Sequence, residues 1–131
     1  MRKLTVCLLV LLASAVAADR DLAGRHAGEW KSGASGSGGA IQFALEAGAD
    51  GSWKCVLTFG LSGAEVQTTM REVKVKDSKV DLSYDFDIQG VTARSHATAE
   101  WDGTVFRGKY ETSLPDGTVL DSGTWNASRV K

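Results

Sequence analysis

The chain has little cysteine and little histidine, and both shortages limit the chemistry that it can perform. Two of its 131 residues are cysteines and two are histidines. Neither His26 nor His96 has a second histidine or a cysteine two or four positions further on, so a zinc site is not expected. EF-hand spacing, a phosphate-binding glycine loop and a nucleophile elbow are also missing. We therefore predict no catalytic residue, no metal and no cofactor, and we do not expect an enzyme.

A long apolar run is also missing. Residues 4–12 form the only extended apolar stretch, and a spanning helix needs roughly 20 apolar residues. The basic residues Arg2 and Lys3 precede this stretch and the small residues of 13–18 follow it, which is the order of a secretory signal peptide. We predict cleavage after residues 1–18 and a single domain over residues 19–131. The mature protein is expected in the periplasm or outside the cell, without a stable membrane anchor.

An excess of positive charge is lacking too. Loss of Arg2 and Lys3 leaves 13 basic against 16 acidic residues, a net charge of −3. Basic and acidic side chains are interspersed, as on an ordinary soluble surface. A nucleic-acid-binding protein would show a basic stripe instead, so no nucleic-acid partner is expected.

Removal of the leader also removes Cys7 and leaves Cys55 as the lone thiol, so no internal disulfide can form. A domain of this length can bury enough surface to fold without one. Cys55 stands at strand spacing between Trp53 and Leu57, which favours a buried apolar filler over a nucleophile, a metal ligand or a dimer cross-link.

What the sequence does contain is a regular alternation of turns and strands. Turn signals such as Ala49-Asp50-Gly51 and Pro115-Asp116-Gly117 separate segments with a period of two, of which 80–88 is the clearest. A change of parity within 65–76 predicts a bulge near Arg71-Glu72. The loop over residues 32–39, rich in glycine and serine, is either a plain connection or a mobile lid. About eight strands are predicted, near 27–33, 40–47, 52–60, 65–76, 79–88, 91–101, 104–112 and 118–129.

These strands predict an all-β fold with consecutive antiparallel neighbours. An up-and-down barrel of about eight strands is favoured over a β-sandwich, because closure removes the exposed sheet edges. Avidin-like barrels have a similar size and bind a ligand among several tryptophans. Packing in the core is nevertheless the favoured role for the four tryptophans of this chain, which are Trp30, Trp53, Trp101 and Trp125.

Two short motifs lie at the ends of the predicted barrel. Gly28-Glu29-Trp30 in the first strand and Gly123-Thr124-Trp125, followed by Arg129, in the last one resemble the ends of a lipocalin-like, or calycin, barrel. The resemblance implies that Trp30 plugs the closed end while Arg129 lies across its ring in a cation–π contact. It therefore gives Trp30, Trp125 and Arg129 structural roles.

The strand predicted at 91–101 suggests a cavity. Its odd-numbered face carries mostly alanine and serine, and its even-numbered face carries Arg94, His96, Thr98 and Glu100. If the small face points inward, larger side chains must fill the barrel or leave room for a small apolar ligand. The opposite phase would place Arg94 and His96 inside. The candidate cavity-lining residues are Phe43, Trp53, Phe59, Tyr84, Phe86 and Tyr110.

Two functions of different kinds fit these observations. The first is a carrier that binds a small lipophilic molecule without catalysis. The second is a secreted protein-interaction module, for instance an inhibitor, with a solid core; an enzyme is a remote alternative. The row Asp81, Asp85 and Asp87 is expected to be a hydrated outer face rather than a calcium site, and Asn126 begins a glycosylation sequon that matters only in a eukaryotic source.

Overall fold

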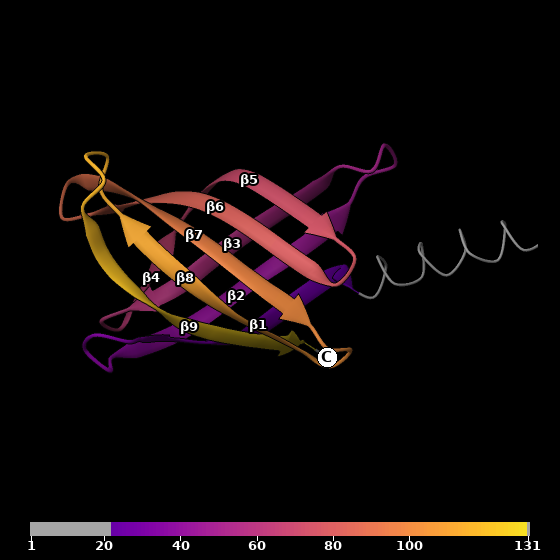
Figure 1. Ribbon diagram of the computed structural model, residues 1–131, viewed down its shortest axis with the longest axis horizontal. Coiled ribbons are helices and arrows are strands. Elements are labelled where there is room, and N and C mark those ends of the chain that lie inside the picture. Colours follow the sequence, from indigo (N-terminus) through magenta and orange to yellow (C-terminus); the bar gives the residue numbers. More distant parts are fainter. Residues whose placement is uncertain (1–21, 131) are drawn as a thin grey trace, which may run out of the picture.

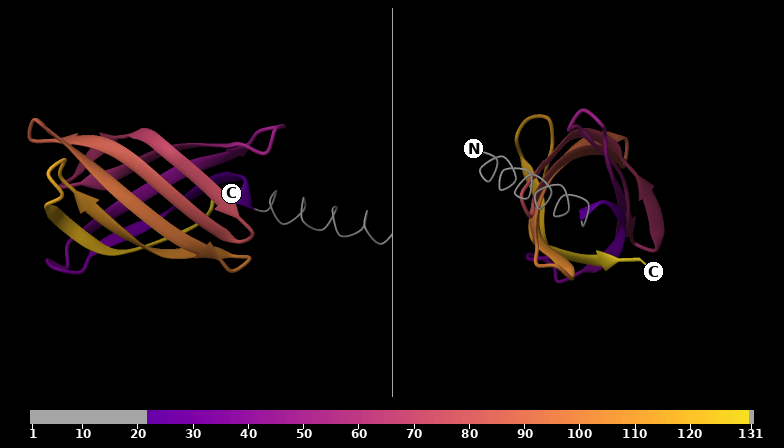
Figure 2. Two further views of the ribbon diagram at one scale, coloured as in Figure 1. Left: turned by 45° about the horizontal axis from the view of Figure 1, so that its top comes forward. Right: turned by 90° about the vertical axis from the view of Figure 1, so that its right-hand side faces the viewer.

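The structure is a computed structural model, and it describes residues 22–130. One antiparallel sheet curls into a nearly closed barrel (Figure 1 and Figure 2). This confirms the predicted barrel and excludes the sandwich, which would need two sheets. The predicted leader, residues 1–18, lies outside the described residues. The strands are β1 (Gly24–Ser32), β2 (Gly38–Ala47), β3 (Trp53–Leu61), β4 (Ala64–Gln67), β5 (Thr69–Lys76), β6 (Lys79–Ile88), β7 (Val91–Trp101), β8 (Val105–Ser113) and β9 (Val119–Arg129).

The strand order is β4-β3-β2-β1-β9-β8-β7-β6-β5, so β1 and β9 pair and join the two ends of the chain. The segment predicted as one strand at 65–76 is divided in two, which gives nine strands instead of eight. β4 pairs with β3, and β5 pairs with β6. Thr68 lies between them, and its hydroxyl donates to the Leu57 carbonyl oxygen at 2.6 Å, which ties the break to β3. The predicted bulge is confirmed as a register shift between Met70 and Glu72.

The pairing of β1 with β9 explains why each terminal motif begins with glycine. A Cβ at Gly28 would collide with the backbone oxygen of Asn126, and a Cβ at Gly123 would collide with that of Lys31. Both glycines therefore allow the two strands to approach closely. The glycine-rich connection between β1 and β2 is shorter than predicted and hydrogen-bonded, since the Ser32 N–H donates to the Ser37 oxygen at 2.8 Å.

The inner face of β7 is the small one, as the favoured phase predicted. Ala93, Ser95, Ala97 and Ala99 are buried, whereas the alternate residues face outward. On the outer face, His96 Nε2 lies 2.7 Å from a carboxylate oxygen of Asp81. Within residues 22–130, no helix is long and apolar enough to cross a membrane.

The two halves of the barrel are filled differently. At the end where β1 begins and β9 ends, the His26 ring stacks on Phe43 and meets Trp101 and Phe106 edge to face. Its Nε2 donates to the carbonyl oxygen of the buried Leu22 at 2.9 Å. We call this region the filled half. Cys55 is buried, as predicted for an apolar filler, and its burial raises the pKa of the thiol to about 12.

Candidate functional site

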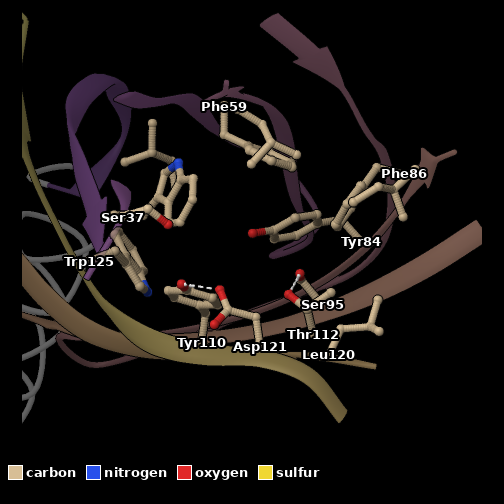
Figure 3. Close-up of a pocket in the computed structure, with 14 residues that line it drawn as sticks. Ser37, Phe59, Tyr84, Phe86, Ser95, Tyr110, Thr112, Leu120, Asp121 and Trp125 are labelled. Atoms are coloured by element: carbon tan, nitrogen blue, oxygen red, sulfur yellow. Dashed lines mark hydrogen bonds between the residues drawn. The ribbon is translucent and has the colours of Figure 1, made fainter. Parts of the chain in front are cut away.

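The other half of the barrel contains a cavity of about 280 Å³ (Figure 3). It lies toward the end where β1, β3, β6 and β8 finish and where β2, β7 and β9 begin. We call this end the mouth. The lining residues come from seven strands and the β1–β2 loop: Trp30, Ser37, Ile41, Phe59, Leu61, Tyr84, Phe86, Ile88, Ser95, Tyr110, Thr112, Leu120, Asp121 and Trp125.

Large aromatic rings form much of the wall. The Trp30 ring is perpendicular to that of Phe59, at a centroid distance of 6.4 Å, and to that of Tyr110, at 6.0 Å. Phe59 in turn meets Phe86 edge to face at 4.9 Å. Because these rings support one another by edge-to-face contacts, they stand along the wall instead of collapsing into the space between them.

The indole N–H groups of the wall are already used. Trp30 Nε1 donates to the Gly60 carbonyl oxygen at 2.9 Å, and Trp125 Nε1 donates to the Lys109 carbonyl oxygen at 3.1 Å. Both tryptophans therefore contribute apolar ring surface to the cavity rather than a hydrogen-bond donor.

A polar row crosses the wall formed by β6, β7, β8 and β9. Strand register places Tyr84 opposite Ser95, Ser95 opposite Thr112, and Thr112 opposite Asp121. The hydroxyls of Ser95 and Thr112 lie 2.5 Å apart in a hydrogen bond (Figure 3). Burial raises the pKa of Tyr84 to about 12, so its phenol stays protonated near neutral pH. Apart from Asp121, the row is made of neutral hydroxyl groups.

Asp121 is held by two neutral donors. The Ser32 hydroxyl donates to its Oδ1 at 2.7 Å. The Tyr110 hydroxyl donates to its Oδ2 at 2.8 Å (Figure 3). Burial raises the pKa of Tyr110 above its ordinary value, and the hydrogen bond to Asp121 and the negative charge of Asp121 raise it further. The phenol therefore remains a donor, and it fixes the orientation of the carboxylate.

The structure brings together four of the six residues predicted to line a cavity: Phe59, Tyr84, Phe86 and Tyr110. Phe43 does not line it, because it packs in the filled half against His26 and Phe106. Trp53 lies at the start of β3, which is also the far end of the barrel from the mouth. The alternation of apolar and polar residues predicts which face of the sheet a side chain lies on, but not its position along the barrel axis. Phe43 and Trp53 face inward, but they lie away from the cavity along that axis.

The arrangement implied for Trp30, Trp125 and Arg129 is also corrected. Trp30 and Trp125 line the cavity and lie opposite each other in the β1–β9 register. Arg129 lies opposite His26, which is four residues before Trp30 in β1. Its Nη1 donates to the Ala23 carbonyl oxygen at 2.7 Å. Trp30 therefore does not plug the filled end with Arg129 across its ring, because β1 carries it toward the mouth.

Asp121 was not predicted as a site residue, although the sequence carries a signal for it. It has the same parity as Gly123, Trp125 and Ala127, which marks the inner face of β9. Inward-facing positions of a barrel are usually apolar, so a carboxylate at one of them is a signal of a special role.

Compared with known protein families and with curated proteins, the chain matches none. Within the described part of the chain, no group of three or more His, Cys, Asp and Glu side chains is placed to hold a metal ion.

Proposed function

We propose that the chain is an exported, lipocalin-like barrel that binds a small, mostly apolar molecule without catalysis. The observation that carries this proposal is the half-empty interior. A dry apolar cavity of about 150 Å³ already accepts a ligand the size of benzene, and drug-sized ligands occupy pockets from about 300 Å³ upward. A cavity of about 280 Å³ lies between these sizes.

The cavity also favours a binder over the two alternatives. A protein-interaction module with a solid core would have no need for an aromatic-walled space. A hydrolase of the Ser-His or Cys-His type would need a histidine beside its nucleophile, and the lining residues include neither histidine nor cysteine. The export of the mature domain rests on the sequence of residues 1–18.

Binding of a neutral lipophilic fluorophore, N-phenyl-1-naphthylamine, tests the proposal. We expect its emission to rise on mixing with the mature protein. Ser95→Leu should reduce this uptake at least about tenfold, because Ser95 is buried in the cavity wall and leucine would occupy the space that the ligand needs.

The matched control is Thr98→Leu, which adds the same side chain to the exposed outer face of β7. It should leave fluorophore uptake unchanged. Absence of uptake by the unaltered protein, or equal uptake by the Ser95→Leu variant, would contradict binding in this cavity.

A further inference from the structure

We infer that the natural ligand carries a positive charge: it is a small organic ammonium compound with an apolar body, and the cationic group lies between Asp121 and the aromatic rings. This inference rests on the proposed function, since it names the chemical class that the same cavity would accept.

The first argument is the charge of Asp121. It is the only charged side chain among the residues that line the cavity. Its hydrogen-bond donors, Ser32 and Tyr110, are both neutral, and within residues 22–130 no ion pair involves it. Asp121 is half-buried, so the cavity wall limits its contact with water, and its two hydrogen bonds come from neutral groups that cancel no charge. A cationic ligand would supply the opposite charge.

A carboxylate elsewhere in the barrel shows what internal compensation looks like. Asp85, on the outer face of β6, accepts hydrogen bonds from Nε of Arg71 and Nε of Arg94, each at 2.7 Å. Asp121 faces the interior with no comparable arginine or lysine among the lining residues. The chain therefore pairs the buried carboxylate of the outer wall with two arginines, and it leaves the half-buried carboxylate of the cavity without an arginine or lysine among the lining residues.

The second argument is the preorganisation of the Asp121 carboxylate. Each of its two oxygens accepts one hydrogen bond, and a carboxylate oxygen has two lone pairs. One acceptor site on each oxygen thus remains for a ligand. Ser32 is buried and the Tyr110 phenol stays protonated, so the two donors hold the negative charge in one place.

The third argument is the arrangement of rings. Trp30 is perpendicular to both Phe59 and Tyr110, so the three rings, from β1, β3 and β8, form adjacent walls. Aromatic faces are negative and attract cations, most strongly where water is excluded, and quaternary ammonium groups are bound in cages of this type. Tyr110 belongs to both the aromatic wall and the Asp121 hydrogen bonds, which brings the two cation-attracting features together.

The other lining residues indicate that the rest of the ligand is apolar. Toward the mouth the cavity is bordered by aliphatic side chains, Leu61, Ile88 and Leu120, and Leu120 is 46% exposed. An apolar body attached to the ammonium group would pack against them. An anionic ligand of the same size would meet the Asp121 carboxylate with no basic side chain in the lining to offset the repulsion.

A pair of isosteric ligands tests the inference directly. Benzyltrimethylammonium and neopentylbenzene have the same shape and differ in a central N⁺ or C atom. Isothermal titration calorimetry should show the cation binding at least about tenfold more tightly than the neutral isostere, which is the scale expected of a desolvated cation–π contact beside a carboxylate.

Variants then locate the charge effect. Asp121→Asn should remove the preference for the cation while leaving affinity for neopentylbenzene within about threefold, because the amide preserves the size of the side chain. Asp87→Asn is the matched control. Asp87 is an exposed carboxylate on β6 near the same end of the barrel, so its loss should leave the preference unchanged. Circular dichroism melting curves verify that both variants are folded.

The outcomes separate this inference from the proposed function. Equal or tighter binding of neopentylbenzene by the unaltered protein would refute the charge inference and leave the proposed function standing. Failure of both isosteres in a protein that takes up the naphthylamine fluorophore would have the same meaning. Failure of all three compounds would refute both, and a cation preference that persists in Asp121→Asn would refute the role of Asp121.

Discussion

Asp85 and Asp121 are carboxylates on opposite faces of the barrel wall, and their surroundings differ. Asp85 was expected to belong to a hydrated outer row, but it is only 7% exposed and lies under two arginines. The alternation of β6 correctly predicted that it faces outward. The contact with Arg94 follows from register, since the tight turn at Gln89-Gly90 places the two residues directly opposite each other. The contact with Arg71 depends on the bulge in β5, whose geometry the sequence does not give.

The ion pairs of Asp85 predict a pH dependence of stability. The hydrogen bond from Arg94, together with that from Arg71, lowers the pKa of Asp85 to about 2 in the folded protein, below the ordinary value of about 3.9. Because the folded-state pKa is the lower one, the stabilisation is complete above about pH 5 and is lost as the pH falls toward 2.

We therefore expect Asp85→Asn to lower the free energy of unfolding at pH 7 by about 1 to 2 kcal/mol, since both arginines are more than half exposed. The variant should also lose stability less steeply between pH 4 and pH 2. Urea unfolding at several pH values measures both effects. Asp87→Asn serves as the comparison and should stay within about 0.5 kcal/mol of the unaltered protein; a similar loss there would show that the ion pairs of Asp85 are not the cause.

Strands were the best-predicted elements, because alternation and turn residues are local signals. The predicted ranges 79–88 and 91–101 coincide with β6 and β7. The sequence did not predict the break at Thr68. The break arises because β4 pairs with β3 whereas β5 pairs with β6. That choice of partner depends on closure of the whole sheet, and a period of two within one segment carries no information about it.

The close approach of β1 and β9 yields a prediction for this pair of strands. Gly28→Ala should destabilise the protein by about 1 to 3 kcal/mol or more, because the new methyl group meets the β9 backbone at Asn126 and neither strand can move without breaking the pairing. Thermal unfolding followed by circular dichroism measures the change.

The comparison for that substitution is Gly60→Ala in β3. A Cβ there would lie 3.5 Å from the nearest atom, the backbone nitrogen of Ala40, which is an ordinary contact. It should be neutral, or stabilising by about 0.4 to 1 kcal/mol through reduced freedom of the unfolded chain. Equal losses at both positions would mean that the β1–β9 contact is not special.

For the molecule as a whole, the sequence predicted a closed barrel and four of the residues around its cavity. It did not predict that one half is solid and the other hollow. Both halves offer alanine or serine from β7, and the difference comes from where His26, Phe43 and Phe106 meet along the barrel axis. The position of these side chains along the barrel axis depends on the stagger of all the strands together. The sequence of a single segment does not give that stagger.

This division predicts unequal costs for removing a ring. Phe106→Ala should lower the free energy of unfolding by about 3 to 5 kcal/mol, because the side chain is fully buried in the filled half. Phe59→Ala should cost clearly less, because one side of that ring already borders empty space. Denaturant titration of the two variants compares them, and equal costs would contradict a hollow mouth half.

The antiparallel pairing of β1 with β9 also determines which end of the barrel would face a support to which the protein is attached. β1 begins and β9 ends at the filled half, where the Val130 N–H donates to the Arg25 oxygen at 2.9 Å. The cavity lies toward the opposite end of the barrel. A protein immobilised through a tag after its last residue would thus present the mouth to the solution, so surface-based ligand assays can use this attachment without covering the site.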